Sequence, residues 1–283
     1  MIRSETLFRI IARLYGTGDQ MKAGEYRIPR TLGVVEIIDR LVEGEGDAKW
    51  VVIPEGWTVN QVADLLEERH LVRRTAFLRA VQRRPSAYGV DLQVSRASLE
   101  GYLMPDTYKF PSRASGADVV GIMVRNWEKK VWKSNEAAFW TSWLTPEKIV
   151  VAASLIEREA KRPEDRARIA SVIRNRLAKK MLLQIDATVL YALGTHKEKV
   201  LLKDLKTPSF YNTYRHKGLP PGPICSPGLK AIEAVLHPED TEYLYYVAQP
   251  DGSHIFTRTG QEHAAAVSRV RQMAAALSGV RAN

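Results

Sequence analysis

Apolar and polar residues along this chain follow two periods, one typical of helices and one typical of short strands. Apolar positions at spacings of three and four residues predict helices over residues 33–43, 58–69, 116–132, 136–143, 163–180 and 263–277. Short β-prone runs near turn residues predict strands over residues 23–28, 50–53, 100–110, 242–248 and 255–257. Helices and strands mixed in this way predict an α+β fold.

The segment over residues 145–160, TPEKIVVAASLIEREA, is the most informative of the predicted helices. Thr145 suits the N-cap, and Pro146 suits the first helical position. Apolar residues between positions 149 and 156 cover most of the helix circumference. The pattern therefore predicts a helix that is largely buried.

Two carboxylates, Glu157 and Glu159, lie near the end of this apolar helix. At roughly 100° per residue they point about 160° apart, so only one of them easily faces a given cleft. A carboxyl group at the edge of an apolar surface tends to have a raised pKa, which suits it to exchange protons near neutral pH. The alternative is that both are boundary charges that pair with Arg158, Lys161 or Arg162.

A repeat is visible in the first part of the chain. Residues 2–11 (IRSETLFRII) resemble residues 72–81 (VRRTAFLRAV), and a glycine-containing predicted strand follows each copy, at 23–28 and at 100–110. A strand and a helix, beginning at residue 50, precede only the second copy. The chain therefore opens in the middle of a repeated unit of strand, helix, helix and strand, and we expect upstream residues that include a membrane anchor.

The incomplete first unit leaves apolar side chains that need a partner. We expect Leu7, Ile10, Ile11 and Leu14 to pack against the helix predicted over residues 33–43, because they would otherwise be exposed.

Composition narrows the possible functions only in part. The 42 Lys and Arg residues against 32 Asp and Glu give a formal net charge of +10, which favours anionic surroundings such as nucleic acid, anionic lipid or a cell-wall polymer. The basic residues are dispersed and no nucleic-acid-binding motif is present, so nucleic acid is not an expected partner. The single cysteine, Cys225, excludes an internal disulfide, and the histidines lack metal-ligand spacing, so we expect neither a metal nor a cofactor. No apolar run approaches the ~20 residues of a membrane span.

A series of motifs extends in one order over nearly the whole chain. The motifs are KAGEYRI (22–28), EGYLMPDTYKF (100–110), AASLIERE (152–159), ASVIRNRL (170–177), LQIDATVLYALG (183–194), PSFYNTYRHKGLPPGPICSPG (208–228), YLYYVA (243–248) and GSHIFT (252–257). In this series the chain resembles the endolytic murein transglycosylases of the YceG-like family, bacterial cell-wall enzymes with a LysM-like module before the catalytic domain. The resemblance implies a partial LysM-like unit and linking helix over residues 1–48, a LysM-like α/β module over 49–112, and a mixed α+β catalytic domain with a buried catalytic helix over 113–283.

The resemblance implies cleavage of peptidoglycan within its glycan strands. The bond cleaved would be the β-1,4 bond between N-acetylmuramic acid and N-acetylglucosamine, and the product would carry a 1,6-anhydro-muramyl end. Such a lytic transglycosylase uses one Glu first as general acid and then as general base, whereas a hydrolytic glycosidase normally needs two carboxylates. The alternative function is a non-catalytic peptidoglycan-binding protein that uses LysM-like modules.

The first candidate for the catalytic residue is Glu159, and the second is Glu157. Leu155 and Ile156 give Glu159 the more apolar surroundings, and the family's catalytic Glu matches the second Glu of ASLIERE.

Further residues are candidates for binding the saccharide. Gln184, Asp186 and Thr188 alternate along a segment that we expect to be extended, so their side chains would share one face. Four other residues carry groups of the kind that bind sugars: the rings of Tyr211 and Tyr214, the amide of Asn212 and the hydroxyl of Ser226. We expect a different role, bracing of the junction between module and catalytic domain, for Glu100, Asp106 and Tyr108.

The resemblance also implies partners and a location. The partners are the glycan strands of peptidoglycan, cell-wall synthases and, through an N-terminal helix absent from this sequence, the cytoplasmic membrane. A single-pass anchor of that kind would hold the catalytic domain on the outer, periplasmic side, and we expect the chain without it to be soluble.

Overall fold

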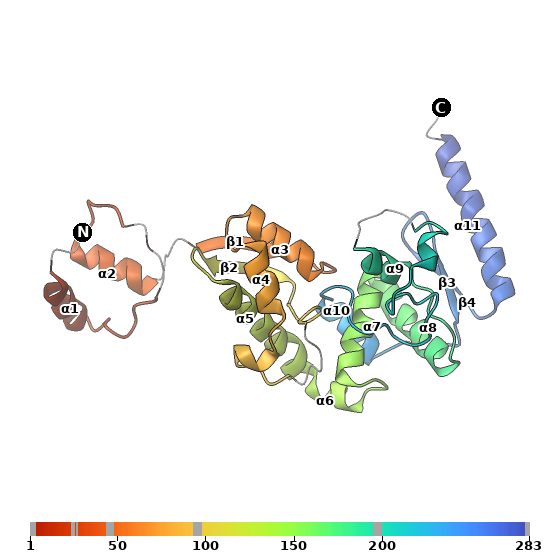
Figure 1. The fold of residues 1–283 in the computed structure, drawn as a ribbon, viewed down its shortest axis with the longest axis horizontal. Helices are drawn as coiled ribbons and strands as arrows, with labels where there is room; N and C mark the ends of the chain where they lie inside the picture. Colours follow the sequence, from red (N-terminus) through yellow and green to blue (C-terminus); the bar gives the residue numbers. More distant parts are fainter. Residues whose placement is uncertain are drawn as a thin grey trace.

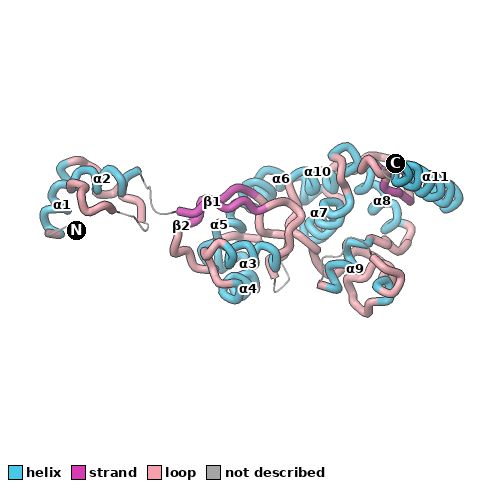
Figure 2. The backbone as a smooth tube through the Cα atoms, turned by 90° about the horizontal axis from the view of Figure 1, so that it is seen from above, coloured by secondary structure: helices cyan, strands magenta, loops and turns pink. Residues whose placement is uncertain are grey.

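The computed structural model describes residues 4–23, 26, 28–43, 48–92, 98–194 and 200–280. The molecule is elongated, with α1 (Glu5–Leu14) and α2 (Val34–Glu43) at one end and α11 (Gly260–Val280) towards the other, as Figures 1 and 2 show. A unit of two strands and three helices lies between them, next to a larger part that is mostly helical. The mixture of helices and two small antiparallel sheets confirms the α+β fold class.

The first two helices, α1 and α2, pack against each other. Ala12 of α1 and both Ile37 and Ile38 of α2 are buried, and Ile11 is half-buried. Three apolar residues of α1 remain largely exposed, namely Leu7 (53%), Ile10 (51%) and Leu14 (81%). The prediction that these three pack against α2 is wrong, because a single neighbouring helix covers only one side of α1.

The strand predicted over residues 23–28 falls partly on residues 24, 25 and 27, which lie outside the described residues. The described positions 23, 26 and 28 form no strand.

The central unit has the predicted order of strand, helix, helix and strand. Its elements are β1 (Ala48–Ile53), α3 (Val59–Glu68), α4 (Arg74–Val81) and β2 (Asp106–Pro111). The two strands are antiparallel, with Val51 opposite Tyr108 and Ile53 opposite Asp106. Thr58 caps α3 through a reciprocal capping box with Gln61, so the sequence itself fixes where this helix begins.

The helix α5 (Gly116–Trp127) packs closely against α4 and against the 3₁₀ turn η1 (Pro85–Tyr88). A Cβ placed on Gly116 would lie only 2.6 Å from the carbonyl oxygen of Ala76, so glycine allows the two helices to approach. The helix α5 therefore packs as part of the central unit. The domain boundary that we predict after residue 112 lies before α5 and would separate this helix from that unit.

The larger part is built around α7 (Pro146–Glu159), whose residues from Ile149 to Ile156 are all buried. This burial confirms the prediction of a buried helix that starts at Thr145 and Pro146. The helices α8 (Arg166–Ala178) and α10 (Leu229–Leu236) both pack against α7.

Further elements complete this part of the molecule. They are the π turn η2 (Glu128–Trp132), α6 (Lys133–Thr141), η3 (Pro163–Asp165), α9 (Asp186–Leu193), η4 (Asp204–Lys206), β3 (Tyr245–Ala248) and β4 (His254–Thr257). The strands β3 and β4 form an antiparallel hairpin, and α11 packs on both of them. None of the described helices combines the length and the apolar composition needed to cross a bilayer.

Candidate active site

The last turn of α7 directs its two carboxylates to different neighbours. Oε2 of Glu159 accepts a 2.9 Å hydrogen bond from the hydroxyl of Tyr246 in β3. Oε2 of Glu157 accepts a 2.9 Å hydrogen bond from the backbone N–H of Gly228. The two side chains therefore occupy different environments, which confirms the prediction made from helix geometry.

Glu159 is the carboxyl group whose environment fits proton transfer near neutral pH. The pKa of Glu159 is raised to about 7: burial is the main cause, the hydrogen bond from Tyr246 opposes it, and the nearby negative charge of Asp186 adds to it. At neutral pH both the protonated and the ionised form of a carboxyl group with this pKa are populated. Glu159 can therefore donate a proton and later accept one.

Polar side chains from two further segments, Asp186 and Tyr214, lie near Glu159. The hydroxyl of Tyr214 donates a 2.5 Å hydrogen bond to Oδ1 of Asp186, the first residue of α9. The pKa of Tyr214 is raised, first by burial and then by this bond to Asp186, so the phenol stays protonated as a donor. Asp186 is exposed and Tyr214 is half-buried, so both have surface that a ligand can reach.

Arg176 of α8 holds the chain segments that carry these groups. Its Nε donates to the carbonyl oxygen of Leu244 at 2.5 Å, and its Nη1 donates to the carbonyl oxygens of Leu182 and Leu183. The guanidinium also lies 5.1 Å from the ring centroid of Tyr245. This arginine therefore ties the start of β3 to the segment that leads into α9, and so sets the position of Tyr246 relative to Asp186.

Glu157 lies at a junction between the central unit and the rigid Pro/Gly loop over residues 218–228. Besides the N–H of Gly228, it has Arg166 as an ion-pair partner at 3.8 Å. Burial raises the pKa of Glu157, the N–H of Gly228 lowers it, and the charge of Glu55 raises it. These contacts to backbone and to a cation are those of a carboxylate that joins two segments.

The Pro/Gly loop is fixed to both of its neighbours by backbone hydrogen bonds. The N–H of Gly56 donates to the carbonyl oxygen of Ser226, and the N–H of Ser226 donates to the carbonyl oxygen of Trp57. On the α7 side, the hydroxyl of Ser154 accepts a 3.0 Å hydrogen bond from the N–H of Ile224. The loop thus bridges the turn after β1 and the buried helix.

Glu100 makes a second connection between the central unit and the larger part. Its carboxyl group accepts hydrogen bonds from the N–H of Val59 at the start of α3, at 3.1 and 3.2 Å, and from the hydroxyl of Tyr191 in α9, at 3.4 Å. The expectation that Glu100 braces this junction is confirmed by these contacts. Asp106 instead bonds Asn126 and Lys130, and the hydroxyl of Tyr108 donates to the carbonyl oxygen of Met104.

The segment that carries Gln184, Asp186 and Thr188 is not extended, and that prediction is wrong. Gln184 has a positive φ of 53°, and a helix begins directly after it at Asp186. The N–H groups of Gln184 and Ile185 donate to the carbonyl and the hydroxyl oxygen of Thr213, which stops the chain from continuing as a strand. The three side chains therefore do not share one face.

The remaining saccharide-binding candidates divide into accessible and buried groups. Gln184 is exposed, and Tyr211 is half-buried with its ring centroid 4.9 Å from that of Tyr191. The buried side chains, each at most 1% exposed, are Thr188, Asn212 and Ser226. The amide of Asn212 donates to the carbonyls of Leu205 and Thr207, so it shapes the loop from inside.

Sequence reasoning missed Tyr246 and Arg176. Both lie inside motifs that we used for the resemblance, YLYYVA and ASVIRNRL, so the signal was present without a role for these residues. Among the described residues, no group of three or more His, Cys, Asp and Glu side chains is placed to hold a metal ion.

Comparisons with known proteins agree with the motif series. The YceG-like family matches residues 1–269. An endolytic murein transglycosylase of Bacillus subtilis is 35% identical over 277 residues, which cover 93% of this chain and 76% of that protein. An endolytic murein transglycosylase of Streptococcus pneumoniae is 28% identical over 291 residues, which cover 93% of this chain but 52% of that protein. This chain therefore spans about half the length of the pneumococcal relative.

A solved structure extends the similarity to the fold. The crystal structure of a yceG-like protein from Listeria monocytogenes superimposes with a TM-score of 0.68 at 33% sequence identity. The match covers 92% of this chain and 90% of that chain, so it includes both the central unit and the part built around α7.

Proposed function

This chain is a member of the YceG-like family, and on that premise we propose that it is an endolytic lytic transglycosylase of peptidoglycan. It cleaves the β-1,4 bond between N-acetylmuramic acid and N-acetylglucosamine within glycan strands. The product carries a 1,6-anhydro-muramyl end. The observation that carries the proposal is the half-buried carboxyl group of Glu159, with its pKa of about 7 and its hydrogen bond from Tyr246.

In the first step Glu159 acts as a general acid. The protonated carboxyl group gives its proton to the glycosidic oxygen, the bond from C1 of the muramyl residue to that oxygen breaks, and the chain ending in N-acetylglucosamine leaves as an alcohol. Positive charge develops at C1 and the ring oxygen. The neighbouring carboxylate of Asp186, held by Tyr214, stabilises this charge electrostatically.

In the second step the same residue acts as a general base. The Glu159 carboxylate takes the proton from the 6-hydroxyl of the muramyl residue while that oxygen forms its bond to C1. The protons balance over the two steps, because the carboxyl group ends protonated as it began and no water takes part. The hydrogen bond from Tyr246 stabilises the ionised form that exists between the two steps.

The predicted saccharide-binding residues then take two kinds of role. We assign contact with the glycan to the accessible side chains Gln184, Asp186, Tyr211 and Tyr214. The buried side chains of Thr188, Asn212 and Ser226 support these residues from within the fold.

The location and further partners belong to the same proposal. An enzyme that acts on nascent glycan strands has its substrate on the outer face of the cytoplasmic membrane, next to the cell-wall synthases. The net charge of +10 fits both an anionic membrane surface and an anionic wall polymer.

The decisive experiment is incubation of the protein with purified peptidoglycan, followed by mass spectrometry of the released fragments. The proposal expects fragments of several disaccharides with 1,6-anhydro-muramyl ends. Reducing ends would indicate a hydrolase instead, and an absence of fragments would indicate a protein that only binds glycan.

A further inference from the structure

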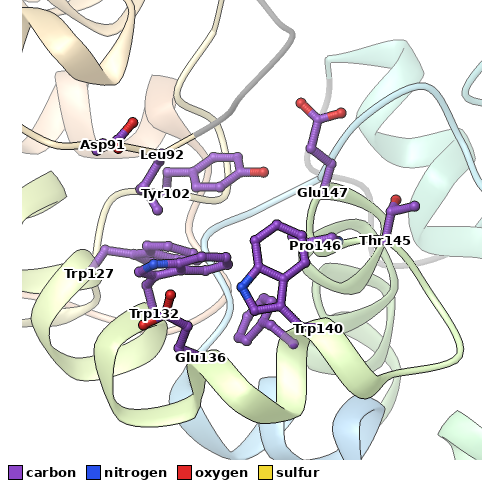
Figure 3. A pocket seen from close by; sticks show the side chains of 11 residues that line it. Asp91, Leu92, Tyr102, Trp127, Trp132, Glu136, Trp140, Thr145, Pro146 and Glu147 are labelled. Atoms are coloured by element: carbon purple, nitrogen blue, oxygen red, sulfur yellow. The ribbon is translucent and has the colours of Figure 1, made fainter.

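A second site lies at the opposite end of α7 from Glu159. A cavity of about 630 Å³ is enclosed by the central unit, by α6 and by the first turn of α7. Figure 3 shows how its side chains come together from separate elements: Tyr102 from the loop before β2, Trp132 from the π turn, Trp140 from α6 and Pro146 from α7. The mechanism above uses none of these residues.

The cavity has aromatic walls that continue into the protein core. The ring centroids of Trp132 and Trp140 lie 5.7 Å apart with an interplanar angle of 82°, so the two indoles form walls at right angles. Phe139 packs against Trp132 on one side and against Trp127 on the other. Trp140 is 63% exposed, Trp132 beside it is half-buried, and Phe139 and Trp127 are buried. An exposed indole on a rigid aromatic base is a flat apolar platform on which a ligand ring can stack.

The charged side chains that line the cavity are carboxylates and not cations. Asp91, Glu136 and Glu147 contribute carboxylates, and none of the described residues that line the cavity is Lys or Arg. In a chain with a net charge of +10 this local charge is unusual and disfavours an anionic ligand. Carboxylates beside an aromatic platform match a ring that carries several hydroxyl donors.

A buried donor belongs to the same lining. The indole N–H of Trp127 has no hydrogen-bond partner among the described residues, although the residue is only 1% exposed. Because this nitrogen is itself closed off from solvent, it does not contact a ligand directly, and the aromatic platform and the carboxylates carry the argument for a sugar ring.

We propose that this cavity is a glycan-binding site for neutral N-acetylhexosamine units, separate from the site at Glu159. The fourteen residues from Pro146 to Glu159 span about 20 Å along the helix. A linear polymer bound at both places is therefore held some distance from the bond that is cleaved. Binding of one strand at two separated sites favours cleavage within long strands over cleavage at their ends. This inference rests on the proposed function for its substrate class, and on the cavity alone for its location.

The test uses the Glu159→Gln protein, which retains the cavity but does not turn over substrate. Calorimetric titration with a β-1,4-linked tetramer of N-acetylglucosamine measures binding, and Trp140→Ala is added to the same background. Loss of the stacking platform should weaken binding about tenfold or more, as expected for a central tryptophan.

The matched control is Trp50→Ala, because Trp50 is equally exposed at 65% but lies on the outer face of β1. It should leave binding unchanged. Equal effects of the Trp140 and Trp50 substitutions, or no binding of the tetramer, would overturn the proposal. Tighter binding of the deacetylated glucosamine tetramer, whose amines are cationic, would also overturn it and would identify a site for organic cations.

Product analysis separates this inference from the proposed function. If wild-type protein releases no anhydro-muramyl fragments while Trp140→Ala still weakens tetramer binding, the cavity stands as a glycan site and the enzymatic proposal fails. If the fragments appear and Trp140→Ala does not affect binding, the enzymatic proposal stands and the cavity is not a glycan site.

Discussion

The hydroxyl of Tyr246 donates a 2.9 Å hydrogen bond to Oε2 of Glu159, across 87 residues of sequence. This bond opposes the effect of burial, which alone would hold the carboxyl group protonated. The balance leaves the pKa of Glu159 at about 7, where a single group can serve as acid and as base. The hairpin that carries Tyr246 therefore has a direct influence on the proposed chemistry.

Glu159→Gln should abolish release of anhydro-muramyl fragments while the protein stays folded. The amide keeps the shape of the side chain but cannot donate and then accept a proton, and general acid–base catalysis accounts for about 10²–10⁴-fold in rate. Fragment release is measured by mass spectrometry and folding by circular dichroism. Glu157→Gln is the matched control, and it should retain cleavage. Activity in the Glu159 variant together with its loss in the Glu157 variant would reverse the assignment of the two carboxylates.

Tyr246→Phe should shift the pH dependence of cleavage rather than only reduce the rate. The phenylalanine removes the hydrogen bond that stabilises the Glu159 carboxylate, so the pKa of Glu159 should rise. Since the first step needs the protonated form, the fall of kcat/KM on the alkaline side should move to higher pH. Initial rates measured between pH 5 and about pH 9 check this shift.

Asp186→Asn provides a test of opposite sign. Its negative charge raises the pKa of Glu159, so removal of that charge should move the alkaline fall of kcat/KM to lower pH. A shift in the same direction for the Tyr246 and Asp186 variants would contradict the electrostatic account of this site.

Glu100 should make the free energy of unfolding fall as the pH rises. Burial raises its pKa to about 8, whereas the ordinary value is 4.5, so the folded protein binds the proton more strongly than the unfolded chain does. The stabilisation is complete below about pH 4.5 and is lost as the pH rises to about 8, with a slope of at most about 1.4 kcal/mol per pH unit.

Denaturant unfolding of wild type and Glu100→Gln at several pH values measures this contribution. The variant is neutral throughout, so its stability relative to wild type should increase between pH 5 and about pH 8. The exposed Glu68→Gln serves as the control and should show no such trend. Parallel curves for wild type and Glu100→Gln would mean that Glu100 does not titrate in this range.

Gly101→Ala should destabilise the contact between the central unit and the Pro/Gly loop. Gly101 has a φ of +86°, and a Cβ there would lie 2.6 Å from Cβ of Pro223. Left-handed backbone costs a side-chain-bearing residue about 1–2 kcal/mol, and overpacking typically adds about 1–3 kcal/mol. Gly89→Ala is the matched control, since Gly89 has a φ of +71° but no neighbour within 4 Å. Thermal or denaturant unfolding should show a larger loss of stability for Gly101→Ala than for Gly89→Ala. Equal losses would mean that only the left-handed backbone, and not the contact with Pro223, opposes the side chain at position 101.

The local pattern of the sequence was sufficient for α7 and for the divergence of its two carboxylates. Thr145 and Pro146 mark the start of the helix, and continuous apolar residues predict its burial. Helical periodicity alone then places Glu157 and Glu159 on different flanks. These features depend on neighbours within one or two turns, so they can be read without knowledge of the fold.

The same kind of pattern misled at two places. Around Gln184, alternation of polar and apolar residues fits both a strand and the start of a helix, and hydrogen bonds to Thr213, about 28 residues away, decided for the helix. In α1 the apolar residues do lie along one side of the helix, as the sequence predicts. The partner helix α2 covers only part of that side, and Leu14 stays 81% exposed.

The sequence by itself determined α7 and most of the other helices, the order of the central unit, the family and the pair of candidate carboxylates. Only the tertiary structure decided that Glu159 lies beside Tyr246 and Asp186, that Glu157 contacts Gly228, and that five aromatic side chains line a second cavity. The physical reason is that burial and long-range contacts set the pKa of a carboxyl group and the shape of a cavity. The flanking residues indicate that the carboxyl group is partly buried, but they do not identify its distant partners or the walls of a cavity.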